Sequence, residues 1–197
     1  MRPMRIVAVV SILLMNGIGL VVGQDNNSPA KTKAPRRPPS LTLTTTAFAD
    51  GAIIPNKFTA LDPSPVSPEL EWTNVPVGTV SFVLIVRDPD VAVRRTTNDI
   101  LHWMLFNIPG SSRGLPEGIP ANSQLADGAI QAKRGNGVIG YLGMGAPAVG
   151  PYHHYTFELY ALDIKLDLGP DATREEVLKA IDGHILGKGM LIGRFHR

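Results

Sequence analysis

A short run at residues 80–86, Val-Ser-Phe-Val-Leu-Ile-Val, apolar at every position but one, constrains the fold of this 197-residue chain more than any other feature. It is too short and too rich in β-branched residues for a buried helix, so it predicts a buried strand. Two similar runs follow at residues 100–108 and 156–162, with Gly- and Pro-rich loops between them. Strands that do not alternate regularly with helices favour an antiparallel β fold over a doubly wound α/β fold.

Shorter signals predict the remaining elements. Residues 41–46 alternate and indicate a first strand, residues 57–59 a second extended piece, and residues 70–72 a strand edge. A helix start follows at residues 171–176, where Asp171 or Thr173 can cap the first turn. The apolar positions after it recur at helical spacing as far as Leu186, with Gly183 dividing the run, and a closing strand is predicted over residues 189–197.

Together these signals predict a mainly β domain over residues 41–197. The simplest architecture is an antiparallel two-sheet β-sandwich with a short C-terminal helical segment. On the strand at 156–162, alternation places Phe157, Leu159 and Ala161 on the core face.

The N-terminal segment has a different composition. Two arginines precede an almost wholly apolar stretch at residues 6–22, and small residues stand before Gln24, so residues 1–23 are predicted to be an export signal peptide. The alternative is an uncleaved membrane anchor. Residues 24–40 are Pro-rich and basic, and predict a disordered linker. We therefore expect an exported protein, periplasmic or extracellular, that is membrane-tethered if the N-terminal segment is retained.

Charge and cysteine content exclude several classes of function. The whole chain is formally +2, but residues 41–197 hold 13 Lys and Arg against 16 Asp and Glu, which is −3. The basic character therefore belongs to the N-terminal segments, and nucleic-acid binding is not expected. The chain has no cysteine, which excludes disulfides, zinc-thiolate sites and thiol nucleophiles.

Residues 140–163 hold the densest group of candidate site residues. A glycine-rich loop leads into His153, His154 and Tyr155. Such a loop can bring backbone N–H groups close to a ligand, and the side chains beside it can donate hydrogen bonds. Because neighbours in a strand point to opposite faces, Tyr155 shares a face with His153 and not with His154.

Two other positions bring ionisable side chains to strands. Asp88 and Asp90 flank a proline at the end of the first apolar run, where carboxylates are also common simply as turn residues. His102 lies beside Trp103 in the second run, and a buried histidine there must find a hydrogen-bond partner.

Several blocks, taken in order, resemble the phosphatidylethanolamine-binding protein family, and most closely its bacterial Raf-kinase-inhibitor-like members. The blocks are VSPELEW (66–72), VPVGTVSFVLIVRDPD (75–90), HWMLFNIP (102–109), GLPEG (114–118), GYLGMGAPAVGPYHHYTFELYALD (140–163) and GHILGKGMLIGRFHR (183–197). The resemblance implies an anion-binding pocket at one end of a β-sandwich. In that pocket Asp88 corresponds to the carboxylate, His102 and His153 to the two histidines, and Tyr155 to the tyrosine.

The chain departs from the family pattern at two positions near this pocket. Residues 145–147 occupy the place of the family's Gly-Pro-Pro loop, with Ala146 where a proline is usual. His154 stands where the family has an arginine, which removes a permanent charge.

We therefore expect a non-catalytic domain that binds a small phosphorylated or carboxylate ligand, such as a phosphoethanolamine head group, without a cofactor or metal. The alternatives are an inhibitor that binds a protein partner such as a protease or kinase, and a metal-dependent hydrolase. Membrane contact is expected only through the N-terminal segment. The predicted ligand-binding residues are Asp88, Asp90, His102, Trp103, Gly143, Gly145, Pro147, His153 and Tyr155.

Overall fold

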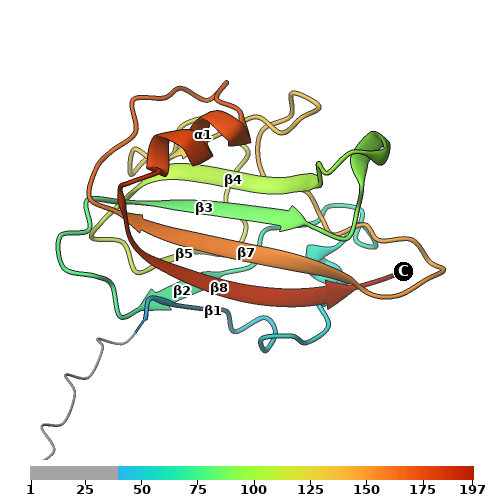
Figure 1. Cartoon of the computed structure of the whole chain (residues 1–197). Coiled ribbons are helices and arrows are strands. Elements are labelled where there is room, and N and C mark those ends of the chain that lie inside the picture. The colour runs from blue at the N-terminus through green and yellow to red at the C-terminus, as the bar shows by residue number, and fades with distance from the viewer. Residues whose placement is uncertain (1–39) are drawn as a thin grey trace, which may run out of the picture. The chain divides into compact units, whose positions relative to one another are not determined.

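The computed structural model describes residues 40–197, which form two antiparallel sheets (Figure 1). The predicted signal peptide and almost all of the predicted linker lie outside these residues. The smaller sheet has the order β1-β2-β5 and the larger the order β6-β4-β3-β7-β8. The strands are β1 (Thr42–Thr44), β2 (Leu70–Thr73), β3 (Ser81–Asp88), β4 (Ile100–Pro109), β5 (Gly114–Leu115), β6 (Ile130–Gln131), β7 (His153–Leu162) and β8 (Ile185–Phe195). The predicted mainly β, two-sheet architecture is confirmed.

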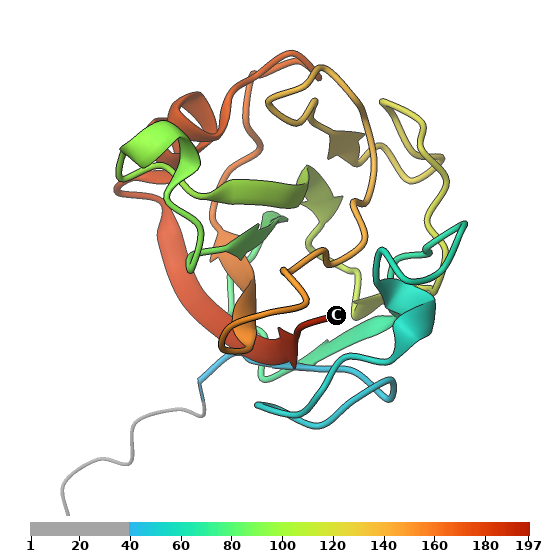
Figure 2. The same cartoon turned by 90° about the vertical axis from the view of Figure 1, so that its right-hand side faces the viewer.

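The first apolar run of the sequence becomes β3, the central strand of the larger sheet. It pairs with β4 on one side and β7 on the other, so each of the three apolar runs lies next to another. Because β3 runs opposite to both neighbours, the end of β3 and the starts of β4 and β7 meet at one end of the sheet. Figure 2 looks onto that end.

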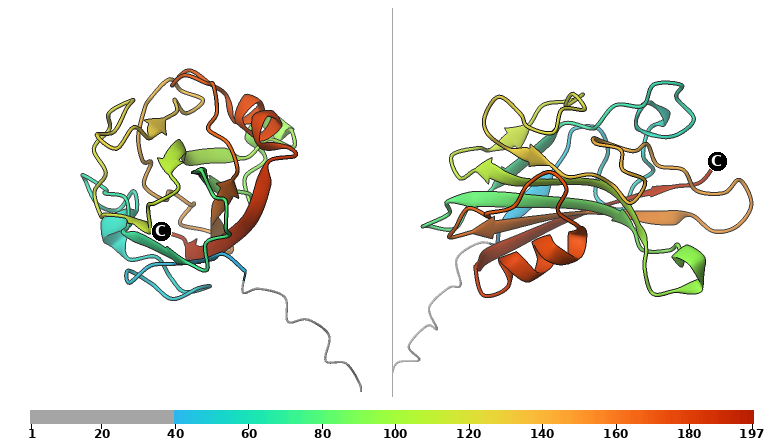
Figure 3. Two further views of the ribbon diagram at one scale, coloured as in Figure 1. Left: turned by 90° about the vertical axis from the view of Figure 1, so that its left-hand side faces the viewer. Right: turned by 90° about the horizontal axis from the view of Figure 1, so that it is seen from above.

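One helix, α1 (Arg174–Ile181), covers the face of the larger sheet that points away from the smaller sheet (Figure 3, right). Thr173 caps it as predicted: its side chain accepts from the N–H of Glu176, and the Glu176 carboxylate accepts from the N–H of Thr173 in return. Gly183, at φ 81°, ends the helical segment, so the apolar residues that follow belong to β8. No helix of residues 40–197 is long and apolar enough to cross a membrane.

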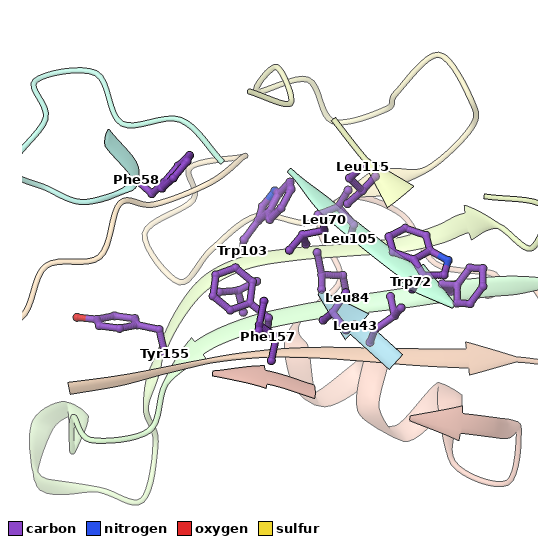
Figure 4. Packing of buried hydrophobic residues seen from close by; sticks show 14 of the residues in the cluster. Leu43, Phe58, Leu70, Trp72, Leu84, Trp103, Leu105, Leu115, Tyr155 and Phe157 are labelled. Carbon is purple, nitrogen blue, oxygen red and sulfur yellow. The ribbon is translucent and has the colours of Figure 1, made fainter. Parts of the chain in front are cut away.

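The main core lies between the two sheets (Figure 4). The predicted inward face of β7 is confirmed, because Phe157, Leu159 and Ala161 are fully buried there. They pack with residues of both sheets, among them Leu43, Leu70, Trp72, Leu84, Trp103 and Leu105. A second apolar cluster fills the space beneath α1, so the larger sheet is buried on both faces.

The prediction of an extended piece at residues 57–59 is wrong. The chain forms a 3₁₀ turn, η1 (Asn56–Phe58), there. Pro55, at φ −61°, leads into the turn, and the backbone N–H and hydroxyl of Thr59 both donate to the carbonyl of Asn56. These local bonds form the turn, Thr59 makes only an isolated β-bridge to Met144, and Phe58 is buried against the core.

Candidate functional site

The candidate site lies at the end of the larger sheet where β3 finishes and β7 begins. Arg87 of β3 pairs with Thr156 of β7, which brings Asp88 next to the first residues of β7. The segment of residues 140–152, orange in Figure 2, crosses this end of the sheet. Residues distant in sequence therefore converge here.

Asp88 is held by hydrogen bonds to both carboxylate oxygens. Oδ2 accepts from Nδ1 of His153 at 2.8 Å, and Oδ1 accepts from the backbone N–H of Asp90 at 3.0 Å. The residue is 2% exposed. Because a carboxylate accepts, Nδ1 of His153 carries the hydrogen, and Asp88 thereby fixes the tautomer and orientation of this ring.

A β-bulge brings His102 into the site. Val86 pairs with Trp103 and Arg87 with Leu101, so His102 is an extra residue with no partner on β3. The bulge breaks the alternation of β4, and the His102 ring packs edge-on against Tyr155, with ring centroids 5.1 Å apart. Tyr155 belongs to the same core cluster as Trp103. The side chains of His102 and Trp103, which are consecutive in β4, thus lie on the same side of the larger sheet.

His102 is buried and electrically neutral at neutral pH. Burial lowers its pKa from the ordinary value, although the carbonyl of Leu142 and the charge of Asp88 act in the opposite direction. Nδ1 donates to the carbonyl oxygen of Leu142 at 2.9 Å. Both site histidines therefore carry the hydrogen on Nδ1, and Nε2 makes no hydrogen bond within residues 40–197.

Tyr155 supplies a donor that the fold does not use. Its hydroxyl is buried and makes no hydrogen bond to any described residue. Burial raises the pKa of this phenol, the nearby Asp88 carboxylate raises it further, and the N–H groups of Gly145 and Ala146 oppose them. Figure 4 shows the hydroxyl pointing away from Phe157 and the core. An unpartnered buried hydroxyl is costly, and a ligand oxygen would satisfy it.

The loop beside these side chains is anchored by its backbone. The N–H of Leu142 donates to the carbonyl of His102 at 2.9 Å, and the N–H of Ala60 donates to the carbonyl of Met144 at 2.8 Å. The side chain of Ala146 is buried in the main core. The position where the family pattern has a proline is thus held here by packing.

Five predicted residues lie outside the group formed by Asp88, His102, His153 and Tyr155, and two of them, Gly143 and Gly145, belong to the loop beside it. Pro147 is exposed, and Trp103 is buried in the core, where its indole N–H donates to Oε1 of Gln131 at 2.7 Å. Asp90, with its side chain 39% exposed, accepts from the backbone N–H and the ring of His154. Burial raises the pKa of Asp90, but these hydrogen bonds bring it below its ordinary value. His154 lies on the exposed side of β7, as strand parity predicts.

The group is nearly closed to solvent, and its most accessible imidazole, that of His153, is 13% exposed. A cavity of about 930 Å³ opens beside it and shares the Leu142 segment, but none of the four side chains lines that cavity. Within residues 40–197, no three His, Asp or Glu side chains form a metal-ligand set.

Sequence reasoning missed the contributions of Leu142 and Ala146. Each acts through a backbone group, the carbonyl of Leu142 and the N–H of Ala146, so neither side chain carries a signal. Only the glycine content of the loop indicated that backbone groups would be available there.

The family model for phosphatidylethanolamine-binding proteins matches residues 44–196. A UPF0098 protein of Methanothermobacter thermautotrophicus is 43% identical over 157 residues, covering 80% of this chain and 99% of the relative. LppC of Mycobacterium tuberculosis, named as a lipoprotein, is 32% identical over 204 residues, covering 98% of this chain and 95% of the relative. Among solved structures, CT736 of Chlamydia trachomatis, described as a homologue of these binding proteins, has a TM-score of 0.69 and 34% identity, covering 80% of this chain and 98% of that chain. The chain belongs to the phosphatidylethanolamine-binding protein family.

Proposed function

We propose that this chain is an exported, non-catalytic domain that binds a small phosphorylated or carboxylate ligand at the group formed by Asp88, His102, His153 and Tyr155. The observation that carries the proposal is the Tyr155 hydroxyl, which is buried, has no hydrogen bond of good geometry to a described residue, and lies close to the Asp88 carboxylate and the N–H groups of Gly145 and Ala146. Donors that converge on one point are what an oxyanion requires.

Binding of an anion by His102 and His153 depends on the protonation of their rings. Because Nδ1 of each ring is already donating, Nε2 can donate to an anion only after the ring takes up a proton. Burial and the charge of Arg134 lower the pKa of His102, so that ring is neutral before binding and must take up a proton to donate to a bound anion. Binding should therefore be accompanied by proton uptake, and affinity for a fully ionised oxyanion should rise as the pH falls from 8 to 6.

Calorimetry with phosphoethanolamine, phosphate and acetate tests both statements. We expect His153→Ala and Tyr155→Phe each to weaken binding by roughly tenfold or more, since each removes a hydrogen bond to a charged ligand. His184→Ala is the matched control, because His184 is also bonded to an aspartate but is largely exposed. Titrations in buffers of different ionisation enthalpy measure the proton uptake. Absence of binding to all three ligands at millimolar concentration would reject the proposal.

A substitution at Gly143 tests separately whether the position of the loop affects ligand affinity. A Cβ at this position would lie 2.9 Å from the Pro65 side chain and 2.9 Å from the backbone carbon of Thr59, so Gly143→Ala must displace the loop. We expect ligand affinity to fall by about tenfold, because the Gly145 and Ala146 N–H groups move with the loop.

Gly145→Ala is the control for this test. Its Cβ would meet the Cβ of Ala60 at 3.7 Å and the carbonyl oxygen of Gly143 at 3.9 Å, which are ordinary contacts, and its N–H is retained. Equal affinities for the two variants would show that the loop position does not matter to binding.

Export is supported by the apolar N-terminal sequence and by the name of the mycobacterial relative. That relative is named as a lipoprotein, whereas this chain has no cysteine to carry a lipid. Its N-terminal segment would act as a cleaved signal or as a protein anchor. Fractionation of cells that produce the full chain, with N-terminal sequencing of the product, distinguishes the two.

A further inference from the structure

The cavity of about 930 Å³ lies outside the proposed head-group site. It is formed by the start of β4, the segment that includes η2 (Val93–Arg95), the turn at residues 133–137 and the N-terminal end of α1. In the right-hand view of Figure 3, η2 and α1 lie on the same side of the larger sheet. The volume falls within the range of roughly 300–1,000 Å³ that is typical of small-molecule sites.

Arg134 lines this cavity with a charge that the protein does not neutralise. The residue is only 9% exposed, and its Nε is buried without a hydrogen-bond partner. It forms no ion pair with any carboxylate of residues 40–197. A guanidinium stays protonated at neutral pH, so the cost of burying it unpaired persists until an anion arrives from outside.

Two of the three carboxylates on the cavity wall are already paired, and the third, Glu175 in the first turn of α1, forms no ion pair with Arg134. On the cavity wall, Asp171 pairs with Lys133, and Asp99 pairs with Arg174 and, at 2.6 Å, with Arg87. These pairs leave Arg134 as a buried positive charge with no acidic group assigned to it in the described part of the chain. The charge balance of the cavity therefore favours an anionic ligand.

Apolar side chains form part of the rest of the wall, where Val93, Ile100, Leu101, Leu142 and Ala172 lie between polar and charged residues. A bare inorganic anion would leave this surface in contact with water, whereas a hydrocarbon group would cover it. The planar fork of a guanidinium suits a carboxylate or a phosphate, which it can bind through two parallel hydrogen bonds.

We propose that this cavity is a second binding site, for an organic anion whose carboxylate or phosphate pairs with Arg134 and whose hydrocarbon body lies against Ile100, Leu101 and Leu142. None of the four head-group side chains lines this site, although Leu142 borders both sites and the charge of Arg134 lowers the pKa of His102.

The direct test is a titration of the full chain with octanoate and with octyl phosphate, followed by the NMR signal of the Arg134 side-chain Nε–H. We expect a saturable shift of this signal, with acetate at least tenfold weaker because it lacks the hydrocarbon body. A response to only one of the two octyl probes identifies the preferred head group. The shift should persist in His153→Ala, which separates this site from the proposed head-group site. An unshifted Arg134 signal at millimolar concentrations of both octyl probes, or an equal response to octyltrimethylammonium, would overturn the proposal.

Substitution of Arg134 gives an independent readout. Arg134→Met removes an unpaired buried charge, so we expect a higher Tm without ligand, at least tenfold weaker octanoate binding, and loss of the Tm increase that octanoate causes in the original protein. Arg95→Met is the control, because Arg95 is exposed and does not line the cavity. A lower Tm for Arg134→Met with octanoate binding unchanged would show that the arginine is structural and contradict the proposal.

Discussion

Replacing Phe157 by Ala is expected to lower the free energy of unfolding by about 3–5 kcal/mol, the range typical of a buried Phe truncated to Ala. Phe157 is fully buried in the middle of β7, with its ring 5.9 Å from that of Phe48 between centroids. The smaller side chain leaves a cavity that β-sheet backbones on both sides cannot close. Denaturation by urea measures the change.

Leu178→Ala is the control for this substitution. Leu178 lies on α1 with 41% of its surface exposed, so truncation there should change the stability by less than about 0.5 kcal/mol. A loss of less than about 1 kcal/mol for Phe157→Ala would mean that the core between the sheets repacks freely.

The next residue along β7 gives the second large effect. Glu158 is buried on the opposite face, where it accepts hydrogen bonds from Arg87 at 2.9 Å, Lys188 at 2.7 Å and the Tyr160 hydroxyl at 2.6 Å. Burial raises the pKa of Glu158, but these partners outweigh it and bring the pKa to about 2 from an ordinary 4.5. Such a difference corresponds to a contribution of at most about 3 kcal/mol from the ionised form.

Glu158→Gln is therefore expected to lower the free energy of unfolding by about 2–3 kcal/mol at pH 7. Because the folded-state pKa is the lower one, this contribution is complete above about pH 4.5 and disappears as the pH falls toward 2. The difference between the original protein and the variant should shrink over that window. Denaturation at pH 7, 4.5 and 3 measures it, with the exposed strand residue Glu71, changed to Gln, as the control. A difference that stays constant across the three pH values would contradict the assignment.

The sequence was sufficient for those parts of the fold that depend on local patterns. The apolar run at residues 80–86 predicted the central strand, and alternation in β7 predicted the inward side of Phe157. Alternation also placed His153 and Tyr155 on one face and His154 on the other. Thr173 was a predicted cap, and the structure gives it both hydrogen bonds of a capping box.

Features that depend on tertiary contacts could not be predicted. Alternation identifies one core face of β7, but it does not show that α1 and three charged or polar partners bury Glu158 on the other. Likewise, Arg134 is a polar turn residue in the sequence, and its burial follows only from the folding of distant segments around it. The position of His102 could not be derived either, because a bulge depends on how two strands pair.

The β-bulge at His102 separates two roles that a regular strand combines, which are to present side chains to a site and to pack against neighbouring strands. In a regular strand, moving a side chain to the other face shifts every residue after it, so binding chemistry and packing cannot change independently. On β4 the extra residue sits between the two registers, which leaves Trp103 seated by its pairing with Val86 whatever occupies position 102. Variants at position 102 can therefore change the side chains at the start of β4 while the sheet keeps its alignment, and their cost to folding is confined to the local contacts of His102 with Leu142 and Tyr155.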